Sequence, residues 1–230
     1  MKRVVLIPAN NEEASLPKVL QDIPKGFVEH IVVVNNVSTD NTATVAKENG
    51  AIVVDEPQLG YGKACLTGIE YIKTHLKPDI IIFLDGDYSD YPEDMKALSE
   101  KLESGYDMVL GSRTISGDGR KGLSPVNTFG NKLAGFFMRL LFGERYTDLG
   151  PFRAIWFDKL LNLRMVDENF GWTVEMQIKA HRKNYKTCEI PVRYRKRYAG
   201  ESKVTGSFKG SVKAFFKITY MFTVYFLRLK

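Results

Sequence analysis

Four short apolar runs recur through the first part of the chain, at residues 4–7, 31–34, 52–54 and 80–84. They are rich in β-branched side chains and too short for helices, which is typical of buried strands. Segments of helical length separate them, so the pattern predicts βαβ units and a mostly parallel sheet. In such sheets the loops after the strands gather at one edge, where ligands bind. Ligand-binding and catalytic residues are therefore expected directly after these runs.

The fourth run ends in Asp85-Gly86-Asp87. Two carboxylates one residue apart can hold a hard divalent cation, which usually also binds phosphate oxygens, and glycine lets the backbone come close. A polar turn that merely closes the strand is the alternative, and a lone D-x-D motif would favour it. A calcium loop is excluded, because it requires glycine where Asp90 stands and glutamate where Lys96 stands.

Basic residues follow at two further places. Arg113 comes after a predicted strand at residues 107–110, and its planar fork suits a diphosphate, although a surface salt bridge is the alternative. Residues 193–203 combine basic and aromatic side chains, a pattern also found in nucleic-acid-binding proteins. This run is short and adjoins the predicted phosphate site, so we expect no nucleic-acid partner. Arg197 and Lys203 would instead neutralise a departing diphosphate.

Composition narrows the class of protein further. The 230 residues carry a net charge of +6, which suits anionic partners, and 44% apolar content supports one substantial core. Cys65 and Cys188 follow no metal-ligand or disulfide pattern, which indicates a reducing compartment. The sequence has no G-x-x-x-x-G-K-[ST] motif, which argues against a nucleotide triphosphatase. Its three histidines form no evident Ser-His-Asp or Cys-His arrangement.

Two segments are expected to be amphipathic helices. Residues 131–142 place apolar side chains at helical spacing, so their apolar side must rest on protein or lipid. Residues 212–229 are apolar with embedded cations, but only ten residues separate Lys217 from Arg228, against the ~20 of a spanning helix. We expect this second helix to lie in a membrane interface, or to pack on the core or on a second subunit in an oligomer. The predicted organisation is a domain at residues 1–206 and an appended helix at 207–230.

Seven short motifs stand in a recognisable order: IPANNEE, VVVNNVSTDNT, FLDGDYSD, GSR, TDLGPFRA, WTVEM and RYAGESK. In this order the chain resembles family 2 inverting glycosyltransferases of the GT-A fold, particularly the polyprenyl-phosphate (dolichyl-phosphate) mannosyl- and glucosyltransferases. The resemblance covers residues 3–206. It implies the Rossmann-like α/β fold of nucleotide-diphospho-sugar transferases, with a mostly parallel sheet flanked by helices.

The resemblance also implies roles for individual residues. The nucleotide pocket would be lined by Pro8, Asn10, Glu12, Val34 and Asn36. Mg²⁺ or Mn²⁺ on the donor diphosphate would be held by Asp85 and Asp87 beside Gly86, with Ser89 as a further ligand. Phosphate groups would be bound by Arg113, Arg197 and Lys203, which with Asp87 form the expected catalytic set. The sugar and acceptor side would be bordered by Asp148, Arg153, Trp172 and Glu175.

The chain departs from the family pattern at Asn35 and Asn36, where the family usually has two aspartates, so the nucleotide, GDP or UDP, stays open. It also lacks the glutamine or histidine that many lipid-phosphate members carry near Ser89 and Asp90.

The implied reaction is metal-dependent, inverting transfer of a hexose from a GDP-mannose-type or UDP-glucose-type donor to a polyprenyl phosphate. The enzyme would act peripherally on the cytoplasmic face of a membrane. If the acceptor is instead a saccharide or other hydroxyl, a carboxylate must take its proton, and Glu175 or Asp148 would be the candidate. A non-catalytic module that binds nucleotide sugar or nucleic acid is the remaining alternative.

Overall fold

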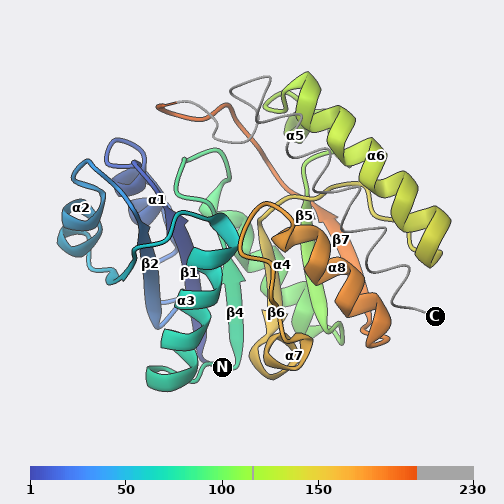
Figure 1. Cartoon of the computed structure of the whole chain (residues 1–230), viewed down its shortest axis with the longest axis horizontal. Coiled ribbons are helices and arrows are strands. Elements are labelled where there is room, and N and C mark those ends of the chain that lie inside the picture. The colour runs from blue at the N-terminus through green and yellow to red at the C-terminus, as the bar shows by residue number, and fades with distance from the viewer. Residues whose placement is uncertain (116, 201–230) are drawn as a thin grey trace.

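The computed structural model describes residues 1–115 and 117–200 of the chain. The expected helix at 212–229 and the predicted phosphate ligand Lys203 lie outside this part. The described residues form a seven-stranded sheet in the order β3-β2-β1-β4-β6-β5-β7 (Figure 1). The strands are β1 (Arg3–Ala9), β2 (His30–Asn36), β3 (Ile52–Glu56), β4 (Ile80–Phe83), β5 (Met108–Ser112), β6 (Arg153–Trp156) and β7 (Thr187–Pro191).

The mostly parallel sheet is confirmed. Strands β1, β2, β3 and β4 pair in parallel, as do β5 and β7, and only β6 runs antiparallel to its two neighbours. Strand β6 was missed by the sequence patterns. It has four residues and begins with Arg153, a charged side chain that hydrophobic periodicity does not assign to a core strand.

Helices cover both faces of the sheet. They are α1 (Leu16–Asp22), α2 (Thr42–Glu48), α3 (Tyr61–His75), α4 (Met95–Glu103), α6 (Pro125–Phe142), α7 (Phe157–Leu163) and α8 (Trp172–Arg182), with a short α5 (Gly117–Arg120) and a 3₁₀ turn at Pro92–Asp94. No helix in the described part of the chain is both long and apolar enough to cross a lipid bilayer.

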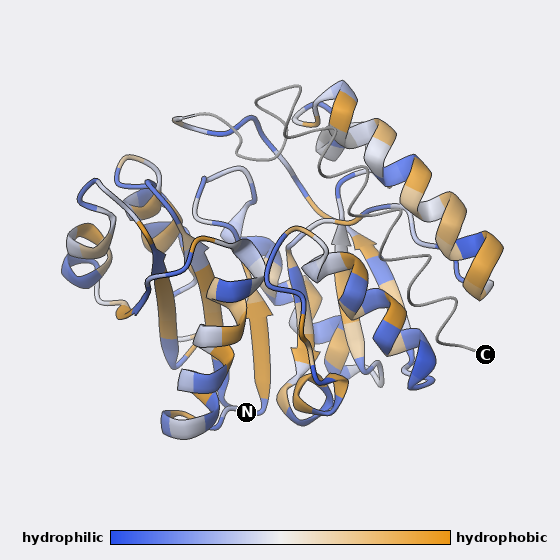
Figure 2. Ribbon diagram, in the orientation of Figure 1, coloured by the Kyte–Doolittle hydropathy of each residue, from blue (hydrophilic) through white to orange (hydrophobic). Residues whose placement is uncertain are grey.

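The core lies in two layers because successive strand residues point to opposite faces. On β1, Val4 and Leu6 join the cluster beneath α3, α6 and α8, whereas Val5 and Ile7 join the cluster beneath α1 and α4. Figure 2 shows the resulting apolar strands between helices that carry both apolar and polar residues. This sandwich fixes the edge of the sheet at which the strand-end loops meet.

Helix α3 packs closely on β1 and β2 at Gly68. A Cβ atom there would lie 2.3 Å from Leu6 Cδ1 and 2.9 Å from Val34 Cγ2, whereas one at Gly130 in α6 would meet nothing within 4 Å. We expect Gly68→Ala to lower the free energy of unfolding by about 1–3 kcal/mol through overpacking. Gly130→Ala should raise it by roughly 0.5–1 kcal/mol through helix propensity. Urea denaturation followed by circular dichroism measures both, and a Gly68→Ala protein as stable as the wild type would contradict this packing.

Candidate active site

Strained backbone marks the loops at the carboxyl ends of β1, β2 and β4. Asn11, Val37 and Tyr88 adopt positive φ angles of 55°, 57° and 60°. Left-handed conformations are uncommon for residues other than glycine and cost on the order of 1–3 kcal/mol each. Because the three strands are adjacent in the sheet, the strain concentrates at one edge, beside Asp85 and Asp87.

Asp87 is buried and held in a fixed orientation. Its Oδ1 accepts hydrogen bonds from the Ser89 backbone N–H at 2.9 Å and from the Ser89 hydroxyl at 2.5 Å. Its Oδ2 lies 3.1 Å from Nη2 of Arg197. Ser89, predicted as a metal ligand, is therefore placed to orient this carboxylate.

Arg197 connects two strand-end loops. Besides its ion pair with Asp87, its Nη1 donates a hydrogen bond of 2.7 Å to Oε1 of Glu12, which follows β1. Glu12 is in turn fixed by a 2.8 Å hydrogen bond from the Ser15 hydroxyl to Oε2. Arg197, after β7, thus reaches the carboxylates of Glu12 and Asp87.

Negative charge is crowded at this point. Burial, and then the charge of Asp87, raise the pKa of Asp85 to about 7, against the opposing effect of Arg197 and Arg113. Asp90 is 2% exposed, and neither of its carboxylate oxygens has a hydrogen-bond partner in the described part of the chain. Burial, and then the charge of Asp85, raise the pKa of Asp90 well above its usual range.

These carboxylates fit a divalent cation that shares its coordination with a ligand. Within residues 1–115 and 117–200, no three His, Cys, Asp or Glu side chains are grouped as a complete metal site. Asp85 and Asp87 supply hard oxygen donors whose mutual repulsion a cation would relieve. Magnesium-type sites commonly use one or two carboxylates and take their other ligands from phosphate oxygens and water. At Gly86 an added Cβ would make only ordinary contacts of 3.5 Å or more, so packing within the described residues does not require glycine there.

Arg113 lies near enough to Asp85 to act on its charge, and it is anchored by Asp148. Its Nε and Nη2 donate to the two oxygens of Asp148 at 2.7 and 2.6 Å, and its backbone N–H donates to Oδ2 at 2.8 Å. Asn131 of α6 adds a 2.7 Å hydrogen bond to Oδ1. Burial raises the pKa of Asp148, but Arg113 outweighs it, so the pKa lies below its usual range. Asp148 therefore serves as the partner that orients Arg113, whose Nη1 takes part in none of these bonds.

The other residues predicted for the acceptor side are buried. Arg153 is fully buried on β6 and donates to the carbonyls of Gly150 and Thr173. Trp172 is 1% exposed and belongs to the core. Glu175 is fully buried, accepts hydrogen bonds from the Val166 and Asp167 N–H groups, and pairs with Lys179. In this structure their side chains build the fold behind the cleft.

Of the residues predicted for the nucleotide pocket, Pro8 and Asn10 are partly exposed near the cleft, while Val34 is buried in the core. The Asn36 side chain donates to the carbonyls of Glu56 and Gln58 at 3.1 and 2.7 Å and accepts from the Gly60 N–H at 2.9 Å. An aspartate could not donate these two bonds. The asparagine that departs from the family pattern therefore joins β2 to the loop after β3.

The sequence patterns missed Tyr194, which covers Arg113. The guanidinium carbon of Arg113 lies 4.8 Å from the centre of the Tyr194 ring, and residue 194 forms a bridge with Asp90. In the sequence, the alternation of basic and aromatic residues from position 193 onward could have pointed to Tyr194.

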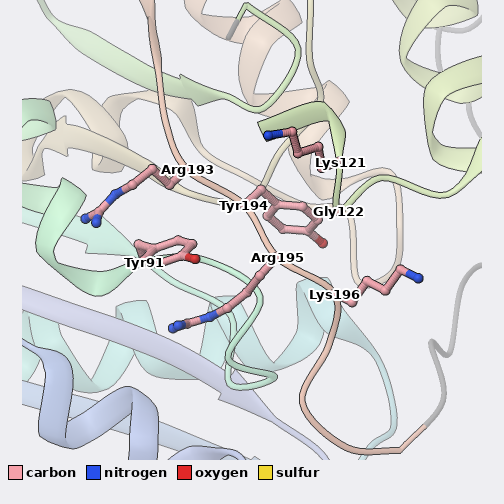
Figure 3. Close-up of a pocket in the computed structure, with 7 residues that line it drawn as sticks. All are labelled: Tyr91, Lys121, Gly122, Arg193, Tyr194, Arg195 and Lys196. Atoms are coloured by element: carbon pink, nitrogen blue, oxygen red, sulfur yellow. The ribbon is translucent and has the colours of Figure 1, made fainter. Parts of the chain in front are cut away.

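Around Tyr194 lies a cavity of about 350 Å³, lined by Tyr91, Lys121, Gly122, Arg193, Tyr194, Arg195 and Lys196 (Figure 3). The four basic side chains point in different directions, and those of Arg193 and Arg195 lie on either side of Tyr91, so they do not converge on one anion.

Comparison with known proteins agrees with this architecture. Residues 4–164 match the glycosyl transferase family 2 model. An uncharacterized glycosyltransferase of Mycobacterium tuberculosis is 36% identical over 211 residues, covering 91% of this chain and 93% of that protein. The glycosyltransferase AglJ of Haloferax volcanii is 28% identical over 192 residues, covering 83% of this chain and 62% of that protein.

Among solved structures, glucosyl-3-phosphoglycerate synthase from Mycobacterium tuberculosis, in complex with Mn²⁺, UDP-glucose and phosphoglyceric acid, is similar in fold. The TM-score is 0.74 at 20% identity, with 96% of this chain and 80% of that chain covered. The described sheet and its flanking helices thus define a GT-A fold. The chain belongs to glycosyl transferase family 2 and is a glycosyltransferase.

The Arg113–Asp148 pair gives a direct test of the site's architecture. We expect Asp148→Asn to lower the free energy of unfolding by about 3–5 kcal/mol, because it leaves the Arg113 charge buried without its partner. The matched control is Glu70→Gln, which removes an ion pair with Lys73 whose side chains are 67% and 52% exposed. It should change stability by less than about 0.5 kcal/mol. Equal effects of the two substitutions in chemical denaturation would contradict the assigned anchoring role.

Proposed function

We propose that this chain transfers a hexose from a nucleotide-diphospho-sugar to a polyprenyl phosphate, with inversion and with Mg²⁺ or Mn²⁺. One observation supports a phosphate acceptor. The two carboxylates considered as general bases, Asp148 and Glu175, are both already held in hydrogen bonds. Asp148 is bonded to Arg113 and Asn131, and Glu175 is fully buried against backbone N–H groups. An acceptor that is already an anion needs no strong general base. A phosphate acceptor fits this arrangement, with Arg113 as its binding group.

On the donor side, Asp85 and Asp87 would hold the metal, and Arg197 would contact the diphosphate. The Asn10 side chain donates to the carbonyls of Asn36 and Val37 at the end of β2. We assign Pro8, Asn10 and Glu12 to the nucleotide side of the pocket. The bound metal would supply Lewis-acid neutralisation of the diphosphate charge.

The reaction then depends on how the chain's own side chains hold the two substrates. Arg113, oriented by Asp148 and covered by Tyr194, would hold the attacking phosphate oxygen toward the anomeric carbon. Arg197, held between Glu12 and Asp87, would stabilise the negative charge that develops on the leaving nucleoside diphosphate. Asp90, buried and without a hydrogen-bond partner in the described residues, is placed to accept hydrogen bonds from hydroxyls of the transferred sugar.

A second candidate is transfer to a hydroxyl acceptor, and one observation favours it. The Asp90 carboxyl has neither oxygen engaged within the described part of the chain, so it could receive a proton from a hydroxyl. The complex of the structurally similar synthase contains UDP-glucose and phosphoglyceric acid, a molecule that carries a hydroxyl group as well as a phosphate. The two candidates share the donor site and differ only in the acceptor.

The deciding experiment supplies purified protein and Mn²⁺ with a panel of GDP- and UDP-sugars and measures nucleoside diphosphate release. It is run alone, with a short-chain polyprenyl phosphate, and with phosphoglyceric acid. We expect release to rise with the polyprenyl phosphate for one donor. Release that rises only with phosphoglyceric acid would replace this proposal with the second candidate.

Two arginines from the same basic run test the assigned roles. Arg197→Ala should lower kcat/KM for the donor on the order of 100-fold, because a group facing the developing charge is lost. Arg193→Ala is the matched control, since Arg193 is an exposed residue that pairs with Glu93 and Asp94 and not with Asp87 or Glu12. It should leave kcat/KM near the wild-type value, and an equal loss in both variants would rule out a specific role for Arg197.

A further inference from the structure

We propose that the outward face of α6 binds the surface of an anionic lipid bilayer and thereby brings a membrane-borne acceptor to Arg113. The delivery of an acceptor to Arg113 rests on the function proposed above, whereas membrane binding rests on α6 alone.

The outward face of α6 carries a stripe of exposed large apolar side chains. Phe129, Phe136 and Leu140 are 61%, 58% and 64% exposed, and Val126 is 42% exposed. Their spacing of three, seven and four residues puts them on one side of the helix. Figure 2 shows apolar positions along this outer helix, at the margin of the molecule. Contiguous exposed apolar patches are rare on soluble monomers and mark interaction surfaces.

The charges on the helix identify the kind of partner. Lys132 and Arg139 are exposed beside the stripe, and residues 125–142 contain no aspartate or glutamate. A second copy of α6 would bring its own Lys132 and Arg139 to the contact, where like charges repel. The chain's own residues 207–230 also carry only basic charges. An anionic lipid surface satisfies both features, because its headgroups attract the cations and its acyl region accepts the apolar side chains.

The inward face of α6 connects this surface to the site. Ala134, Met138 and Phe142 pack in the core, so the helix is already anchored to protein on that side. Asn131 on the same inward face donates to Asp148, which holds Arg113. Only the thickness of one helix, about 10 Å, separates the two faces. A bilayer on the outward face would therefore lie about one helix diameter from the Asn131–Asp148 contact that positions Arg113.

The test measures cosedimentation of the full chain with vesicles of phosphatidylcholine alone and of phosphatidylcholine mixed with phosphatidylglycerol. We expect the wild type to bind the anionic vesicles preferentially. The combined variant Phe129→Ser, Phe136→Ser and Leu140→Ser should bind them at least about ten-fold more weakly. Its matched control, Leu161→Ser, Val166→Ser and Phe170→Ser, removes three exposed apolar residues elsewhere and should bind as the wild type does. All proteins keep residues 207–230, so the difference reports on α6.

Transfer assays separate this inference from the proposed function. The α6 variant should retain transfer to a soluble short-chain polyprenyl phosphate and lose at least about ten-fold of transfer to one embedded in vesicles. If no polyprenyl phosphate is a substrate, the proposed function fails, while vesicle binding still tests the surface. Unchanged vesicle binding by the α6 variant would overturn the inference. So would a wild type that ignores vesicles and forms a dimer that the variant abolishes.

Discussion

One guanidinium group, that of Arg197, joins the two loops on which the site depends. It forms ion pairs with Glu12 after β1 and with Asp87 after β4, and so places a positive charge beside these carboxylates. Without it, Asp85 and Asp87 would repel each other in a partly buried setting, as the raised pKa of Asp85 already indicates. Arg113 balances the same charge from the other side. The structure thus holds acidic and basic side chains close together in a mostly buried setting, which strengthens their action on a charged ligand.

The topology of the sheet creates this meeting point. Because β1 and β4 are adjacent and parallel, their strand-end loops lie side by side at one edge. Strand β6 enters between β4 and β5 in the opposite direction, and the segment that precedes it carries Asp148 to the same edge. Helix α6, directly before this segment, supplies Asn131 to the Asp148 carboxylate. Arg113 is therefore positioned by Asp148 and, through it, by Asn131, both far from Arg113 in sequence.

The sequence predicts an element correctly where a single physical cause, such as burial in a sheet, produces its residue pattern. The β-branched runs predicted β1 to β4, because continuous apolar strands are buried on both faces of a parallel sheet. Prediction from the sequence failed at β6, where Arg153 is fully buried and its guanidinium donates to the backbone carbonyls of Gly150 and Thr173. Asp85, Asp87, Arg113 and Arg197 do gather at one edge, as strand-end logic predicts. Asp148 and Glu175 were considered as bases, and their hydrogen-bond partners, many residues away or in the backbone, could not be read from motifs. Asp90 and Tyr194 were not assigned roles because their importance lies in burial and contact.

We propose that Asp85 and Asp87 bind a nucleoside diphosphate through a divalent cation. Isothermal titration calorimetry of UDP and GDP into the full chain tests it, with Mn²⁺ present and with the metal removed by a chelator. We expect binding of one nucleotide that requires Mn²⁺ and is lost in Asp87→Ala, while that variant keeps the wild-type circular dichroism spectrum. Nucleotide binding that is equally tight without metal, or that survives Asp87→Ala, would contradict it.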